Sequence, residues 1–516
     1  MNRKNLEDNT IISNNKRIAK NTLFLYIRMF LVMGVSLFTV RIVLNALGVI
    51  DYGIYNAVGG MTVLFTFLSG TMAHASQRFF SYELGKGDKH KIKEIFKANM
   101  TIYAIISVVV VLLTETIGLW FVNVKMVIPP ERLGAANWIY QFSILSFVFS
   151  MFSAPCQAVI ISREKMSMFA YISIFEVFAK LSVAYLMLVV ACDKLKFYAV
   201  LHFFVVGGIA LIYILLCKKR YEECSFTFNW NREYLGLILG YTGWSFYGHA
   251  AMSLRGQGVN ILLNLFFGPA VNTARGIAFQ VNTAVYRFCV DFFMAVKPQI
   301  IKYYAQNNFK EMYNLIYRSS KFCYFLTLLV SIPVLLEMHF ILQLWLKNIP
   351  EYTILFSRIV IITSLVDAIS LSLSTSADAT GKIKHYQLLI GTIILLNIPL
   401  CWIFFKLGCL PQAAMYTVLC VAIVVLIFKI FMAKKMVCLP VKDFFVKVIA
   451  TIMMVTVTSF IFPVLLLNYI DEGLARLCII TCVSIGWTGA MIYLLGLSKN
   501  ERRYVASMIK IQKEYL

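Results

Sequence analysis

The sequence predicts an all-α, polytopic membrane protein, and composition and hydropathy pattern both indicate it. Of the 516 residues, 60% are apolar and 14% are charged, and the mean hydropathy is +0.76. A water-soluble fold has no means of burying that much hydrocarbon in a chain of this length. The period-two strands of a membrane barrel are absent from the sequence. We therefore expect a bundle of transmembrane helices.

Fourteen apolar stretches are each long enough to cross a hydrocarbon core of about 30 Å. The expected spans are 21–46, 50–77, 98–122, 136–161, 168–191, 197–217, 238–266, 270–296, 321–345, 352–377, 386–406, 410–433, 444–468 and 474–496. The first stretch is too long for a signal peptide and lacks a small-residue cleavage site, so we expect it to remain as helix 1.

The net charge of +23 is distributed unevenly along the chain. Lysine and arginine gather in both tails and in alternate loops, as in Lys86 to Lys93, Lys218 to Arg220 and Lys434–Lys435. This is the positive-inside pattern, which predicts that both termini are cytoplasmic. The basic loops are expected to meet anionic lipid headgroups, and we do not expect nucleic acid binding.

The chain contains an internal repeat. Gln299 follows Gln77 and Tyr304 follows Tyr82 by 222 positions, and Lys382 follows Lys165 by 217. Because each copy holds six helices, an even number, the copies share one orientation and predict two lobes around a central cleft. The expected parts are a cytoplasmic tail at 1–20, an N-lobe at 21–217, a cytoplasmic linker at 218–237, a C-lobe at 238–435, helices 13 and 14 at 436–497, and a second cytoplasmic tail at 498–516.

Two amphipathic segments follow helices 2 and 8, at residues 84–98 and 307–319. Their apolar residues recur at helical spacing among charged ones. We expect each to lie flat at the membrane surface.

The charged residues within the spans are mostly arginines, with Arg275 near the start of helix 8 as the leading candidate. A charge at that depth costs at least about 2.5 kcal/mol and marks a functional site by default. Glu176 with Lys180, and Arg287 with Asp291, stand four apart on their helices and are expected to neutralise each other. The remaining charge is cationic. Since the planar guanidinium donates two hydrogen bonds to phosphate oxygens, we expect an anionic cargo.

Other polar residues carry less information. Intramembrane asparagines can bind sugar hydroxyls but more often join helices, and a lone histidine on an apolar helix is usually a packing residue. The twelve cysteines form no metal-ligand pattern, so we expect no metal, no disulfide and no cofactor.

The repeat, the hairpin from Asn264 to Asn282 and the turns Ser162 to Lys165 and Gly381 to Lys384 resemble the multidrug/oligosaccharidyl-lipid/polysaccharide (MOP) flippase superfamily. Within it, the chain looks most like bacterial polysaccharide transporters of the O-antigen flippase type. This resemblance implies export of an undecaprenyl-diphosphate-linked oligosaccharide, an O-antigen or capsular repeat unit, to the outer leaflet by alternating access. It also implies a location in a bacterial inner membrane, with polysaccharide polymerase and assembly proteins as candidate partners.

From these arguments, the expected substrate-binding residues are Arg28, Arg41, Arg255, Arg275, Arg287, Asn272 and Asn282. Asp291 and Asp367 are candidates for coupling to Na⁺ or H⁺. The alternatives are a drug/cation antiporter of the multidrug and toxic compound extrusion (MATE) type and a membrane enzyme that acts on lipid-linked glycans. The excess of intramembrane arginine argues against the antiporter. The short outer loops argue against an enzyme, so we expect a transporter.

Overall fold

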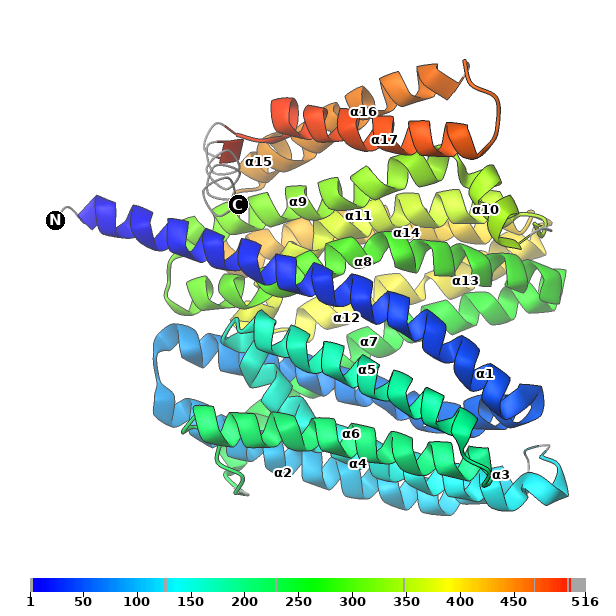
Figure 1. The fold of residues 1–516 in the computed structure, drawn as a ribbon. Helices are drawn as coiled ribbons and strands as arrows, with labels where there is room; N and C mark the ends of the chain where they lie inside the picture. Colours follow the sequence, from blue (N-terminus) through cyan, green and yellow to red (C-terminus); the bar gives the residue numbers. More distant parts are fainter. Residues whose placement is uncertain are drawn as a thin grey trace. The chain divides into compact units, whose positions relative to one another are not determined.

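The computed structural model describes residues 3–124, 126, 128–227, 230–346, 349–467, 469–498 and 501–502. Every regular element in these residues is a helix (Figure 1). Eleven helical segments among them are long and apolar enough to cross a membrane. The prediction of an all-α, multi-pass membrane protein is confirmed.

The chain divides into two compact units, Met1–Phe246 with Ile301–Asn307, and Tyr247–Ile300 with Asn308–Leu516. Helices α7 (Arg232–Phe267) and α8 (Pro269–Ala305) each run from one unit into the other. We call the two parts unit 1 and unit 2.

Unit 1 is built from the first six predicted spans. Its helices are α1 (Arg3–Lys86), α2 (Lys89–Leu113), η1 (Thr114–Gly118), α3 (Leu119–Val124), η2 (Pro130–Arg132), α4 (Leu133–Ser162), α5 (Met166–Val189) and α6 (Lys194–Arg220). Helix α1 holds two predicted spans, which meet at Gly48, where φ is 76°. Helix α1 packs on α4 and α5, and α4 packs on α6.

Unit 2 contains the later spans. Its helices are α9 (Phe309–Leu336), α10 (Met338–Leu346), α11 (Thr353–Thr380), α12 (Lys384–Leu395), α13 (Asn397–Lys406), α14 (Gln412–Val437), α15 (Val441–Phe444), η3 (Phe445–Ala450), α16 (Thr451–Leu467), α17 (Leu474–Met491) and η4 (Ile492–Gly496). The predicted eleventh span is divided at Leu396, because Pro399 has no N–H to donate to the carbonyl of Leu395. Helix α11 packs on α9 and α14.

The internal repeat is also present in the backbone. The helix-ending positions with positive φ recur in pairs: Gly48 (76°) with Gly268 (81°), Gly87 (78°) with Asn307 (56°), and Glu164 (58°) with Gly381 (74°). The next residues, Asp88 and Asn308, both cap helices, since their side chains accept from the N–H of Lys91 and Glu311. The two halves therefore use the same turns at the same places.

The two predicted surface helices are wrong as separate elements. Residues 89–98 form the first turns of α2, and residues 309–319 form the first turns of α9. Neither stretch is followed by a helix-breaking residue, so each helix continues into its span. The apolar residues Ile92, Phe96, Met312 and Ile316 are buried in the protein.

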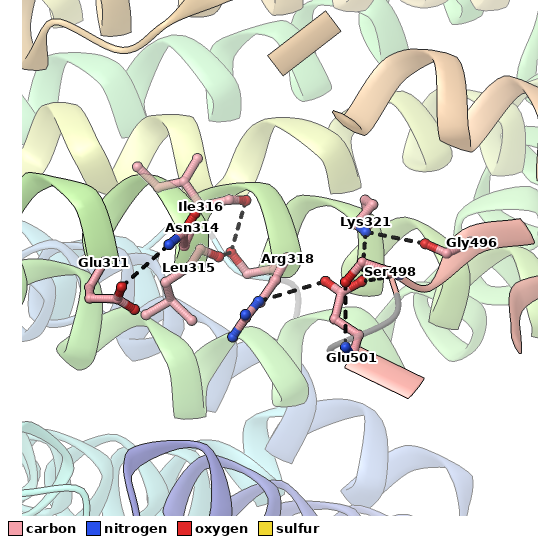
Figure 2. Close-up of polar contacts among 10 residues, drawn as sticks. Glu311, Asn314, Leu315, Ile316, Arg318, Lys321, Gly496, Ser498 and Glu501 are labelled. Carbon is pink, nitrogen blue, oxygen red and sulfur yellow. Dashed lines mark hydrogen bonds and ion pairs between the residues drawn. The ribbon is translucent and has the colours of Figure 1, made fainter. Parts of the chain in front are cut away.

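A polar cluster fastens the end of the described chain to α9 (Figure 2). Lys321 Nζ lies 3.0 Å from Glu501 Oε2 and donates to the Gly496 carbonyl at 3.2 Å. Arg318 Nε lies 3.7 Å from Glu501 Oε1, and the Ser498 N–H donates to Oε2 at 2.7 Å. Burial alone would raise the pKa of Glu501, but Lys321 and Ser498 together hold this pKa below its ordinary value of 4.5. Helices α16 and α17 pack on each other, and α17 also packs on α9 (Figure 1).

Candidate functional site

Arg275 lies in the second turn of α8, just after the hairpin that joins α7 to α8. Gly268 makes that turn with φ at 81°, and its N–H donates to the Asn264 carbonyl at 2.9 Å. A residue with a side chain is disfavoured in this left-handed conformation. The turn directs α8 back along α7, and the Arg275 side chain is buried, with 8% of its surface exposed.

The Arg275 guanidinium is held by α7 and by its own helix. Nη1 donates to Asn260 Oδ1 at 3.0 Å, and Nη2 donates to the Gly256 carbonyl at 3.1 Å. Gly256 and Asn260 are one turn apart, so both face α8. The guanidinium carbon lies 4.6 Å from the centre of the Phe279 ring.

The hydrogen-bonding partners of Arg275 are electrically neutral. Within the described part of the chain, no carboxylate forms an ion pair with Arg275, and its buried Nε has no hydrogen-bond partner. Arg255, half-buried on α7, exerts Coulombic repulsion on it. A buried cation without a counterion is costly in a protein interior. This arrangement can bind an anion.

Asn272 precedes Arg275 by three residues and so lies on the same side of α8. Its Oδ1 atom is buried and, among the described residues, has no hydrogen-bond partner. Buried polar atoms are nearly always paired, so this acceptor is available to a ligand hydroxyl.

Two other predicted site residues of unit 2 are occupied by local contacts. Arg287 Nε lies 3.3 Å from Asp291 Oδ2, which confirms the expected i,i+4 pair. Asn282 Oδ1 accepts from the Ser364 hydroxyl of α11 at 2.7 Å. The structure therefore brings Asn272 and Arg275 together on one side of α8, whereas Asn282 and Arg287 have protein partners of their own.

The two predicted arginines of unit 1 differ in burial. Arg28 is buried, and its guanidinium carbon lies 4.9 Å from the centre of the Phe169 ring of α5. Arg41 is exposed on α1. The expected pair of Lys180 with Glu176 is confirmed, with 2.6 Å between Nζ and Oε1.

Asp367 is the first of four polar residues along one face of α11, which we call the α11 stripe. Asp367, Ser370, Ser374 and Asp378 recur at spacings of three and four residues, which places them on one face of the helix. Lys429 Nζ of α14 donates to Ser370 Oγ at 3.0 Å, and the hydroxyl of Tyr386 donates to Ser374 Oγ at 3.0 Å. Lys429 and Arg255 both act electrostatically on Asp367.

Some of these residues are not among those predicted from the sequence. Asn260 was one of several asparagines without an assigned partner, and Gly256 offered only a backbone carbonyl. Lys429 is a single charge within an apolar stretch. The three- and four-residue spacing of the polar residues on α11 is the sequence signal that would have indicated its partners. Asp378 was missed because it lies just beyond the predicted span.

Comparison with known proteins gives the fold. No protein-family model matches the chain, and no curated protein sequence matches it. The chain resembles the outward-facing structure of a multidrug resistance MATE family transporter of the MOP superfamily, with a TM-score of 0.69 and 12% identity over 82% of this chain and 96% of that one. It resembles a MOP superfamily transporter from Pyrococcus furiosus, with a TM-score of 0.68 and 11% identity over 83% and 96%. It also resembles the MATE transporter ClbM in complex with Rb⁺, with a TM-score of 0.68 and 13% identity over 80% and 94%.

Hydropathy and helix order define the class as a multi-pass helical membrane protein. Within that class, the fold is that of the MATE transporters of the MOP superfamily.

Proposed function

We propose that the protein is a flippase that moves an undecaprenyl-diphosphate-linked oligosaccharide from the cytoplasmic to the outer leaflet by alternating access. The observation that supports this function is the buried Arg275, whose hydrogen-bonding partners in the described chain are neutral. A diphosphate would supply the missing negative charge.

The neighbouring groups suit such a cargo. Arg255 adds a second positive charge close to Arg275. Asn272 offers an unsatisfied acceptor for a sugar hydroxyl one turn away. We propose Arg28, Arg41, Arg287 and Asn282 as further contacts along the path of the cargo.

The membrane potential assists this direction of transport. An interior-negative potential of about 100 mV is worth about 2.3 kcal/mol for each charge moved fully across. An anion of about two charges gains from outward travel, and the emptied cationic site is drawn back inward.

Ion coupling is proposed for Asp367 rather than Asp291, because Asp291 is ion-paired with Arg287. Within the described residues, Asp367 has no ion pair, yet Lys429 and Arg255 attract it electrostatically. These two cations oppose the binding of H⁺ and of Na⁺ to Asp367 alike, so the proposal covers either ion.

The second candidate function is a MATE-type drug/cation antiporter. The half-buried Asp367 favours it, since a cationic drug requires an acidic site. The Arg275 site, which would repel such a cargo, favours the flippase.

The deciding experiment measures flipping of lipid-linked oligosaccharide in reconstituted vesicles, normalised to folded protein. Arg275→Ala should reduce flipping at least about tenfold, because truncating one partner of a buried charged contact costs about 2–5 kcal/mol. Arg275→Lys should recover only part of the activity, since it restores the charge but not the planar fork.

Arg358→Ala is the matched control, because Arg358 is exposed on α11 of the same unit. It should flip at the wild-type rate. Wild-type flipping by Arg275→Ala would contradict the proposed function, and efflux of a cationic drug by the wild-type protein would favour the antiporter.

A further inference from the structure

Glu164 lies in the turn between α4 and α5, and its buried carboxylate contacts two cations, the largely buried Lys302 and the exposed Arg17. Its side chain has no exposed surface, and its carboxylate lies 2.5 Å from Lys302 Nζ and 2.7 Å from Arg17 Nε. Its backbone carbonyl accepts from Asn21 Nδ2 at 2.8 Å. One carboxylate therefore joins α1, the α4–α5 turn and the end of α8.

The end of α8 approaches α1 closely beside this cluster. A Cβ atom on Gly85 would lie 2.8 Å from Ala305 Cβ and 2.9 Å from the Lys302 backbone, so a glycine is required there. The rings of Tyr82 and Tyr304, which are equivalent residues of the two repeats, have centres 6.4 Å apart. Asn14 Nδ2 donates to the Tyr303 hydroxyl at 3.0 Å.

The partners of Glu164 come from both halves of the chain. Arg17 precedes the first predicted span and Asn21 begins it. Lys302 lies in the last turns of α8, a helix of the second repeat. These last turns belong to unit 1, whereas the preceding part of α8 belongs to unit 2. The neighbouring pair differs in this respect. Arg163 forms an ion pair with Glu223, which lies in the linker directly after α6. Both residues therefore belong to the first half of the chain.

We propose that Glu164 is a conformational latch. It holds the end of α8 against α1 while the side of the transporter at which the chain begins is closed to solvent. It releases Lys302 when that side opens. Buried without its partners, the carboxylate would be unstable, so the cluster is either closed or fully opened to water. In water the same ion pairs contribute little. The closed cluster and the opened cluster are therefore two distinct states, as alternating access requires.

The backbone conformation of Glu164 also indicates a functional position. Glu164 has φ at 58°, a left-handed conformation that non-glycine residues rarely adopt, whereas its equivalent in the second repeat is Gly381. Residues held in such conformations gather at functional positions.

The latch rests on the proposed transport function, so one experiment uses transport and another does not. In the first, Glu164→Cys/Lys302→Cys, in a background without exposed cysteines, is joined by a bis-methanethiosulfonate reagent that a reductant cleaves. Flipping should stop after cross-linking and return after reduction. Glu164→Cys alone, treated in the same way, is the control. Flipping that continues in the cross-linked protein would overturn the latch.

The second experiment measures hydrogen exchange of residues 301–306 in the reconstituted full-length protein without cargo. Glu164→Gln should speed exchange there at least about fivefold, whereas Glu223→Gln, which breaks the neighbouring ion pair, should not. No change in Glu164→Gln, or an equal change in both variants, would overturn the latch. If Glu164→Gln does not fold, Lys302→Met is measured instead with the same expectations. Because this readout needs no cargo, its outcome is independent of whether the protein flips lipid-linked oligosaccharide.

Discussion

Two arginines of this protein, Arg132 and Arg275, have opposite surroundings. Arg132 lies in unit 1 and donates from Nε to Asp51 Oδ1 at 2.8 Å and from Nη1 to Asp193 Oδ2 at 3.2 Å. Asp193 also caps α6 by accepting from the N–H of Leu195 at 3.1 Å. Arg275 lies in unit 2 and donates to an amide oxygen and a backbone carbonyl.

Under the proposed function, Arg132 is a structural charge and Arg275 is a cargo-binding one. Arg132 is neutralised by two carboxylates and joins the ends of three predicted spans. No carboxylate among the described residues compensates the charge of Arg275. Such a charge lowers the stability of the fold unless a ligand binds to it. The number of carboxylates around an arginine therefore helps to distinguish a structural charge from a candidate binding charge.

The largest expected effect comes from giving Arg275 a carboxylate of its own. Asn260→Asp places an anion at the atom that now accepts from Nη1, so a diphosphate must displace it. We expect flipping to fall about tenfold or more while the melting temperature stays equal or rises. Asn264→Asp, one turn further on α7 and exposed, should flip normally. Normal flipping by Asn260→Asp would remove the distinction between the two arginines.

The reverse change removes the charge from the structural cluster. Arg132→Ala should lower the free energy of unfolding by about 1–3 kcal/mol, less than for a fully buried pair, because the Asp51 and Asp193 side chains are 18% and 29% exposed. Flipping per folded protein should be unchanged. Thermal denaturation in detergent measures the first quantity, with Arg232→Ala, an exposed arginine at the start of α7, as the control. A loss of flipping with intact stability would reverse the assignment.

The smallest effect is expected at Glu501, where one carboxylate meets Lys321 and Arg318. Because the pKa of Glu501 is lowered in the folded protein, its stabilising contribution is complete above the unfolded value of 4.5 and is lost as the pH falls through the folded pKa. The protection of residues 492–498 from hydrogen exchange, relative to an unfolded chain at the same pH, should therefore fall below about pH 4.5. In Glu501→Gln this protection should be low at all pH values and lack the transition. A wild-type profile without the acid transition would mean that the cluster does not hold the end of the chain.

The fold was largely predictable because it depends on hydropathy and repetition. The matching positions of Gln77 and Gln299, and of Tyr82 and Tyr304, indicate two related halves from the sequence alone. The site was predictable only in part. Arg275 is recognisable as a charge in an apolar helix, but its contact with Asn260 depends on how α7 and α8 are rotated about their axes, which the sequence pattern does not define. The role of Lys429 was not predicted, because its hydrogen bond to Ser370 joins α14 to α11 and depends on how these two helices pack.

The latch also shows where the two repeats of the chain differ. In the second repeat the equivalent of Glu164 is Gly381, and in the first repeat the equivalent of Lys302, at the 222-residue offset of Tyr82 and Tyr304, is the buried Phe80. A protein assembled from two first halves would have two glutamates and no lysine, and one assembled from two second halves would have the converse. The ion pair therefore requires two halves that differ at these two positions, so the two halves of the present chain are not interchangeable there.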